Sequence, residues 1–212
     1  LAIDDLNDWI GCLGGHPQVK TPNLDELAAR GTLFTNAHCQ APVCNPSRPS
    51  GLLGLRPSTT GIYSLQPSFK KVPKYANHVT IPKVFSLNGY NTSTLGKIYH
   101  GVPPKGEFDK VGTKAPLPNR FPDEKLVKTP QNHKLVDWGI WPPKDSDQQD
   151  YKTADWAVNE LSQKPKDPFF MAVGFFRPHV PLYASQEWFD LYPEESLILP
   201  PIRRDDLSLI HI

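Results

Sequence analysis

A cysteine stands near the start of a rigid and basic segment, QAPVCNPSRPS, which spans residues 40–50. Cys44 lies two residues before Pro46 and four residues before Arg48. A helix that begins here would place its free backbone N–H groups and the positive end of its dipole beside the sulfur. Arg48, one turn further on, could reach back to the same point. This setting stabilises a thiolate or a bound anion, whereas the alternative is an ordinary packing thiol.

Two adjacent carboxylates, Asp4 and Asp5, follow a short apolar segment at the beginning of the chain. Their charges repel each other unless a cation or hydrogen-bond donors offset them. Carboxylate oxygens suit a hard cation such as Ca²⁺ or Mg²⁺. Taken alone, an exposed acidic turn is the better interpretation of this pair.

Two later segments add a cation and two histidines. In GYNTSTLGKIYH, Gly96 allows close backbone approach, Lys97 offers positive charge to an oxyanion, and His100 can exchange protons near neutral pH. In RPHVP, His179 stands between two prolines. The local alternatives are a surface lysine, a loop histidine and a structural histidine.

The surrounding pattern indicates which elements must position these groups. Helices are predicted over 21–31, from the cysteine motif to about residue 55, over 81–87 and over 151–161, and strands over 33–37, 90–95 and 168–176. The last strand, PFFMAVGFF, is apolar throughout and is expected to be buried on both faces. Helices that alternate with apolar strands predict an α/β fold with a mostly parallel central sheet flanked by helices. Because ligands of such sheets gather at the carboxyl ends of the strands, we expect all four segments at one rim.

Composition narrows the possible partners. The chain has 212 residues, 38% of them hydrophobic, and a formal net charge of +1, so bulk charge favours neither a nucleic acid nor a membrane surface. No apolar run approaches the roughly 20 residues that span a bilayer. The three cysteines cannot all pair with one another, and no CxxC or HxxxH spacing supports a zinc cluster.

The domain organisation is expected to be a single incomplete domain over 1–206. Residues 101–149 form a long irregular insertion punctuated by PPKGE, APLPN and WPPKD, and loops of this length commonly line a site. The tail at 207–212 has no turn or capping signal. Both ends suggest a piece of a larger protein.

The motifs resemble those of a known family. CNPSR at 44–48 resembles the sulfatase signature C-x-P-S-R, whose cysteine is converted to formylglycine. The strand-end aspartates, the segment at 89–100 and RPHVP at 177–181 stand in the order typical of formylglycine-dependent sulfatases of the alkaline phosphatase superfamily. TPNLDELAARGTLFTNAH, GLRPSTTGIY and FFMAVGFFRPHVP look most like the iduronate-2-sulfatase branch.

This resemblance implies sulfate-ester hydrolysis, with a sulfated carbohydrate as substrate and a role for each matching residue. Asp4 and Asp5, with residue 44, would bind calcium, and Cys44 would carry the aldehyde after a formylglycine-generating enzyme has acted. Arg48 would orient its hydrate, and the remaining catalytic roles would belong to Lys97, His100 and His179. Members act mostly in periplasmic, secreted or lysosomal settings. A truncated piece is expected to be inactive alone.

Two other functions stay open at this point. A phosphonate or phosphate ester hydrolase of the same superfamily would use the same cradle, because both anions are tetrahedral. A non-catalytic carbohydrate-binding relative would leave Cys44 unmodified. Asn45, Gly51 and Leu95 depart from the commonest signature residues, but none removes a group that performs chemistry. The remaining metal ligands and a second sulfate-binding lysine of the family have no convincing match in this chain.

Overall fold

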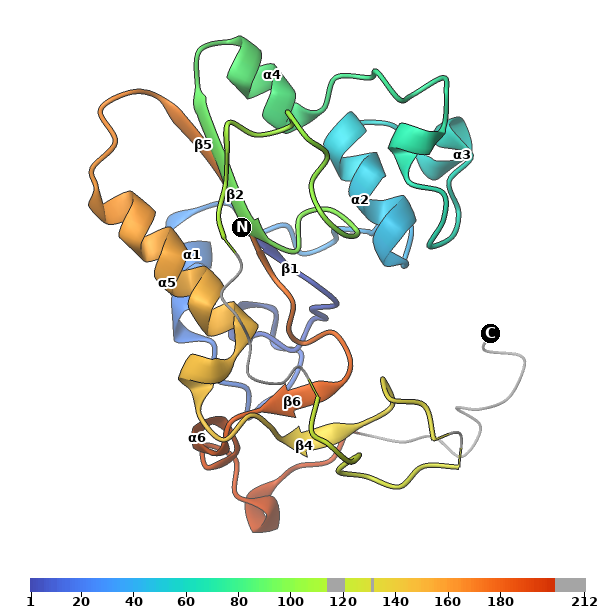
Figure 1. Cartoon of the computed structure of the whole chain (residues 1–212). Coiled ribbons are helices and arrows are strands. Elements are labelled where there is room, and N and C mark those ends of the chain that lie inside the picture. Colours follow the sequence, from blue (N-terminus) through green and yellow to red (C-terminus); the bar gives the residue numbers. More distant parts are fainter. Residues whose placement is uncertain (114–120, 131, 201–212) are drawn as a thin grey trace. The chain divides into compact units, whose positions relative to one another are not determined.

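The computed structural model describes residues 1–113, 121–130 and 132–200 of the chain (Figure 1). Contacts divide it into two compact units, of which the first comprises Leu1–Leu6 and Ala37–Gln186, and the second comprises Asn7–Asn36 and the segment from Glu187 onward. All seven residues that the sequence assigns to a site belong to the first unit. The tail expected at 207–212 lies outside the described residues.

A four-stranded parallel sheet forms the centre of the first unit. Its strands are β1 (Ala2–Ile3), β2 (Asn91–Gly96), β3 (Lys110–Val111) and β5 (Phe169–Phe175), in the order β1-β5-β2-β3. Every pair in it is parallel, and Gly96 of β2 is in register with Gly174 of β5. The predicted α/β class with a mostly parallel sheet is therefore confirmed.

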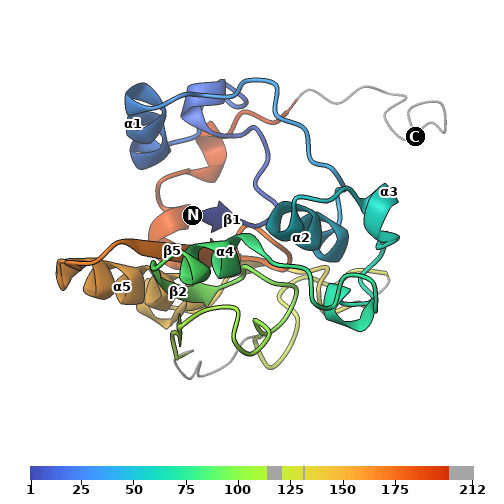
Figure 2. The same cartoon turned by 90° about the horizontal axis from the view of Figure 1, so that it is seen from above.

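Helices of the first unit flank this sheet. They are α2 (Cys44–Leu53), α3 (Pro57–Thr60), α4 (Ile81–Leu87) and α5 (Gln149–Ser162), with short 3₁₀ turns at Phe69–Lys71 and Asp145–Asp147. Helix α5 packs against β2 and β5, and α4 packs against β2, as the view from above shows (Figure 2). The helices predicted after the cysteine motif, over 81–87 and over 151–161 are confirmed.

Two strand predictions need correction. Residues 33–37, predicted as a strand, form turns and irregular backbone, because none of the described strands pairs with them and their β-forming side chains alone do not hold a strand. Strand β5 exists as predicted, but only Val173 and Gly174 are fully buried along it. The region at 101–149, expected to be irregular, also contains two strands that the pattern did not indicate. They are β3, at the edge of the central sheet, and β4 (Trp138–Ile140), which pairs in parallel with β6 (Leu182–Ala184).

The second unit contains a helix whose two ends are indicated by proline and glycine in the sequence. Helix α1 (Pro22–Arg30) begins after Thr21, has Pro22 at its first position and ends before Gly31, as predicted. Its Leu27, an apolar residue that would favour a core-facing side of the helix, is instead 54% exposed. The unit also contains 3₁₀ turns at Gly11–Leu13 and Glu194–Ser196, and the helical turn α6 (Gln186–Phe189) begins at the last residue of the first unit.

The core of the first unit lies next to the segment that follows β2. Buried apolar side chains form one cluster there: Leu53, Ile62, Phe69, Tyr99 and Phe108. Tyr99 belongs both to this cluster and to the loop that carries the predicted Lys97 and His100. That loop is therefore anchored by packing. Among the described residues, none of the helices is long and apolar enough to cross a membrane.

Candidate active site

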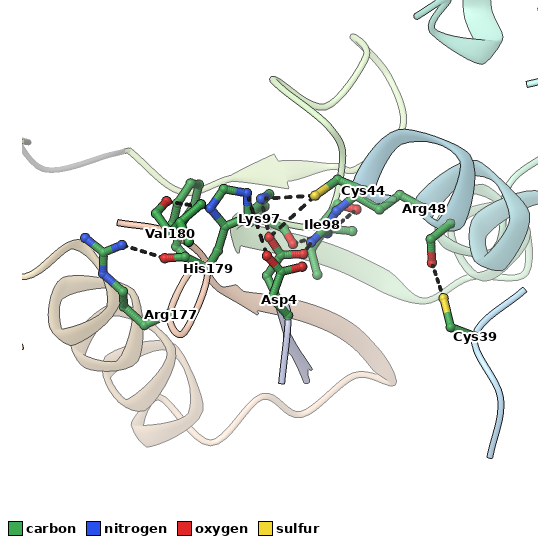
Figure 3. A network of polar contacts seen from close by, with 12 residues as sticks. Asp4, Cys39, Cys44, Arg48, Lys97, Ile98, Arg177, His179 and Val180 are labelled. Atoms are coloured by element: carbon green, nitrogen blue, oxygen red, sulfur yellow. Dashed lines mark hydrogen bonds and ion pairs between the residues drawn. The ribbon is translucent and has the colours of Figure 1, made fainter. Parts of the chain in front are cut away.

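Asp4 is the centre of the polar cluster at the carboxyl ends of the strands. It follows β1, its backbone N–H donates to the Phe175 carbonyl at 3.2 Å, and its side chain is buried. One carboxylate oxygen accepts from Arg48 Nη2 and the other from Lys97 Nζ (Figure 3). Two cations from segments far apart in the sequence thus meet on one carboxylate.

Two glycines let Lys97 reach this position. Gly96 has a φ of +87°, and a Cβ built there would lie 1.9 Å from the carbonyl oxygen of Gly174. A Cβ on Gly174 would in turn lie 2.4 Å from the backbone of Lys97. Strands β2 and β5 therefore approach so closely at their ends that only glycine fits, and the chain turns there to present the lysine.

Cys44 is the first residue of α2, so its sulfur lies at the helix end where backbone N–H groups are free. Its Sγ is 3.9 Å from Asp4 Oδ2 and 3.7 Å from Lys97 Nζ. Arg48, one turn along the same helix, also donates through Nη1 to the carbonyls of Lys97 and Ile98. Helix α2 thus fixes both the thiol and the guanidinium against the end of β2.

His179 completes the group from the loop after β5. A ligand atom of His179 lies within 4.8 Å of ligand atoms of Asp4 and Cys44, which makes these three a possible metal-binding set. Its Nδ1 lies 2.7 Å from the Val180 carbonyl, so a proton on Nδ1 would leave Nε2 as an acceptor. Nε2 lies 3.9 Å from Asp5 Oδ2.

The two adjacent aspartates have different environments. Asp4 is buried between the cations, whereas the Asp5 side chain is 52% exposed. Asp5 has a φ of +57°, a left-handed backbone conformation that aspartate adopts more readily than most residues. The turn at Asp5 directs consecutive carboxylates into different surroundings, so the cluster contains one buried carboxylate and one accessible one.

Cavities open on both sides of Cys44. One of about 400 Å³ is lined by Cys44, Lys97, His100, Asp150 and His179, together with Phe176. The other, of about 590 Å³, is lined by Asp4, Asp5, Cys44 and Arg48 among others. The structure therefore brings all seven residues singled out in the sequence to the walls of two cavities that share the Cys44 side chain.

Both cations of the cluster, Lys97 and Arg48, contact Asp4, while the exposed Asp5 adds a second carboxylate beside His179. Burial alone would raise the pKa of Asp4, but the hydrogen bonds and charges of Lys97 and Arg48 outweigh it and lower that pKa. Partial desolvation, followed by the positive charges of Lys97 and Arg48, lowers the pKa of His100. A neutral His100 and an ionised Asp4 are thus favoured near neutral pH. Such a site is suited to an anionic ligand.

Three residues that sequence reasoning did not assign also shape the site. Asn45 is buried and donates to the carbonyls of Ser64 and Pro67, each at 2.9 Å, which explains an amide in the signature. Asp150, in the first turn of α5, accepts backbone hydrogen bonds after β5. Phe176 places its ring 4.3 Å from Lys97 Nζ. No local pattern marks these contacts, because the partners are distant in the sequence.

Comparison with known proteins shows which families and structures this chain is similar to. The family model described as Sulfatase matches residues 1–197. A sulfatase of Formosa agariphila is 41% identical, over 98% of this chain and 44% of that protein. Iduronate 2-sulfatase of Mus musculus is 34% identical, over 95% of this chain and 38% of the mouse protein. The solved structure of a 2-O GAG sulfatase gives a TM-score of 0.57 at 26% identity, over 84% of this chain and 34% of that one. The chain spans less than half the length of these relatives.

Proposed function

The chain belongs to the sulfatase family, and on that premise we propose that the whole protein hydrolyses sulfate esters on a sulfated sugar. The observation that carries this proposal is the convergence of Lys97 and Arg48 beside Cys44 at the start of α2. A sulfate ester is an anion that repels nucleophiles, so positive charge must be in place before attack on sulfur. A sulfated sugar as substrate is supported by the similarity to iduronate 2-sulfatase and to a 2-O GAG sulfatase.

Lys97 and Arg48 would hold the sulfate oxygens and neutralise the charge that develops on them. Both side chains are only 11% exposed, and charge stabilisation is stronger where water is excluded. Within the described residues, the buried Nε of Arg48 has no hydrogen-bond partner. Buried polar atoms without a partner are rare in folded proteins, which supports a role for this N–H toward a group bound in the site.

His100 and His179 would contact different oxygen atoms of the reacting groups. His100, whose pKa is lowered, would accept a hydrogen bond from the nucleophile. His179 would contact the sulfate near the leaving oxygen, since it lies across the cluster on the loop after β5. A proton delivered there would release the sugar as a neutral alcohol.

Cys44 would first be oxidised to formylglycine by a formylglycine-generating enzyme. When hydrated, this aldehyde supplies a hydroxyl that attacks sulfur and a second hydroxyl through which sulfate is expelled as the aldehyde re-forms. A serine or cysteine would instead be left with a stable covalent sulfate. Asp4 and Lys97, which contact each other and lie 3.9 and 3.7 Å from Sγ, would hold and orient the hydroxyls.

Asp4 and residue 44, two of the three residues whose ligand atoms lie within 4.8 Å of one another, would suit a calcium ion once Cys44 carries oxygen in place of sulfur. Asp4 and Asp5 offer carboxylate oxygens, which Ca²⁺ prefers, whereas a thiol is a poor ligand for a hard cation. The protein already places positive charge between Asp4 and Cys44, in the form of the Lys97 ammonium. Asp4, Asp5 and the modified residue 44 would therefore hold the ion, which would supply further neutralisation of the sulfate.

The direct test uses the whole protein produced together with a formylglycine-generating enzyme. We expect an aldehyde at residue 44 by peptide mass spectrometry, release of sulfate from 4-nitrophenyl sulfate and from sulfated sugars, and loss of activity on calcium chelation. The variant Cys44→Ala should be inactive, whereas Cys39→Ala, which changes an exposed thiol, should keep the wild-type rate. An aldehyde without any sulfate release would refute the proposed reaction.

The same protein preparation also tests the two alternative functions. If a matched aryl phosphonate ester has a higher kcat/KM than the aryl sulfate, the protein is a phosphonate hydrolase. If Cys44 remains a thiol in a host that modifies other sulfatases, a non-catalytic carbohydrate-binding role is favoured. A periplasmic, secreted or lysosomal location is part of the proposal, and cell fractionation would test it.

A further inference from the structure

Asp150 stands at the point where β5 ends and the loop that carries His179 begins. It lies in the first turn of α5 and lines the 400 Å³ cavity with Lys97 and His179. Its Oδ1 accepts from the Phe176 N–H at 2.8 Å, and its Oδ2 accepts from the same N–H at 3.0 Å and from the Arg177 N–H at 2.7 Å. These N–H groups lie just beyond β5, and a buried backbone donor left unpaired is costly.

Phe176 connects this carboxylate to both sides of the site. Its ring centroid lies 4.3 Å from Lys97 Nζ, which is within the range of a cation–π contact. The same ring is tilted against the His179 imidazole, with 4.8 Å between the ring centroids. A shift of the Phe176 backbone would therefore move the support of a catalytic lysine and a catalytic histidine together.

Arg177 extends the restraint along the loop. Its Nη1 donates to the His179 carbonyl at 2.7 Å and also to the Pro181 carbonyl (Figure 3). The His179 N–H in turn donates to the Phe176 carbonyl at 3.0 Å. The turn that presents His179 is therefore closed by contacts of two residues, Phe176 and Arg177, whose backbones Asp150 holds.

We propose that Asp150 is a positioning residue, which fixes His179 and Lys97 through the backbone of Phe176 and Arg177. In this role both carboxylate oxygens act as acceptors of backbone hydrogen bonds. Its catalytic consequence rests on the proposed sulfate-ester hydrolysis. Its structural consequence, the placement of the His179 ring, does not.

The test compares Asp150→Asn with Asp109→Asn in the whole mature protein. Asp109 makes a similar contact at the opposite end of the sheet, where it accepts the N–H and the hydroxyl of Thr92 at 2.8 Å. We expect D150N to lower kcat for an aryl sulfate about 10- to 100-fold with a smaller change in KM, since misplacement of reacting groups acts mainly on the rate. D109N should leave both constants close to wild type.

A double-mutant cycle with Phe176→Leu tests whether Asp150 acts on the catalytic residues through Phe176. If Asp150 acts through Phe176, the rate losses of D150N and F176L will not multiply in the double variant. F176L also keeps the proposal testable if D150N folds poorly. Multiplicative losses, or a loss of kcat in D109N equal to that in D150N, would overturn it.

A measurement that needs no turnover separates this proposal from the proposed function. NMR resonances of the His179 ring, assigned with His179→Gln, should shift in D150N and stay unchanged in D109N. Unchanged His179 resonances in D150N would overturn the positioning role, whatever the activity. A wild-type protein without sulfatase activity would refute only the proposed reaction.

Discussion

Two buried carboxylates of the first unit, Asp4 and Glu107, look alike in several respects and differ in what surrounds them. They are 8% and 5% exposed, each pairs with a lysine, and each has a lowered pKa. Glu107 pairs with Lys70 at 2.7 Å and accepts hydrogen bonds from Thr80 and Tyr99. Its negative charge is balanced by one cation and two hydroxyl groups.

Asp4 is instead bound by two cations, with a thiol 3.9 Å from its carboxylate and cavities beside it. Asp4 alone balances only one of its two cations, and the exposed Asp5 nearby is the second carboxylate of the cluster. Burial, ion pairing and a shifted pKa thus do not separate a structural carboxylate from one in a site, because both kinds show all three. The number of cations on the carboxylate, two on Asp4 and one on Glu107, and access to Asp4 from a cavity do separate them.

The largest expected difference follows from removing the lysine of each pair. Lys97→Met should lower kcat/KM for sulfate esters about 10²- to 10³-fold, the usual loss for one charge-stabilising donor. Lys70→Met removes the cation of Glu107 and should leave the activity of the folded protein near wild type. Steady-state kinetics on both variants measures the two losses. Similar losses in kcat/KM would show that Asp4 and Glu107 do not differ in their importance for the activity.

The next effect concerns stability. Glu107→Gln should lower the free energy of unfolding by about 2 kcal/mol, because the buried amide leaves Lys70 without its counter-charge and weakens two hydrogen bonds. Urea unfolding at pH 7 measures this change, with activity per folded molecule as the control. A variant as stable as the wild type would show that the Glu107 network contributes nothing net.

The stabilisation by Glu107 should also depend on pH. Burial would raise its pKa, but hydrogen bonds from Lys70, Thr80 and Tyr99 lower it below the ordinary 4.5. The folded protein therefore binds this proton less tightly than the unfolded chain does. The contribution is complete above the unfolded pKa and is lost as the pH falls through the folded one. The difference between wild type and E107Q should stay constant above about pH 5 and shrink as the pH falls below about 4.3. A difference that shrinks already well above the unfolded pKa would contradict the lowered pKa.

The smallest expected effect is on His100. Desolvation and the charges of Lys97 and Arg48 lower its pKa below the usual 6.5, so His100 should stay neutral to a lower pH than a free histidine. In Lys97→Met, one of the two charges is gone, and the pKa of His100 should rise toward that of a free histidine. NMR titration of the His100 ring measures both values. A pKa that falls in K97M would indicate that Lys97 does not act through its charge.

Much of the fold and the site follows from local sequence. Pro22 and Gly31 mark the ends of α1, and apolar segments separated by helical ones indicate a parallel sheet. Because such strands end at one edge, the residues after them, among them Cys44 before its helix, could be expected to meet. The strand predicted over 33–37 failed for the converse reason, since a β-forming segment needs a neighbour with which to pair and the sequence does not name one.

The residue types of the site were determined by the sequence, and their environments by the tertiary structure. Asp4 and Asp5 are identical neighbours, yet only the backbone turn at Asp5 and the arrival of Arg48 and Lys97 bury one and expose the other. Asp150 likewise became part of the site only when α5 packed against the end of β5. Burial and charge pairing are properties of distant segments in contact, and no local pattern encodes which segments those are.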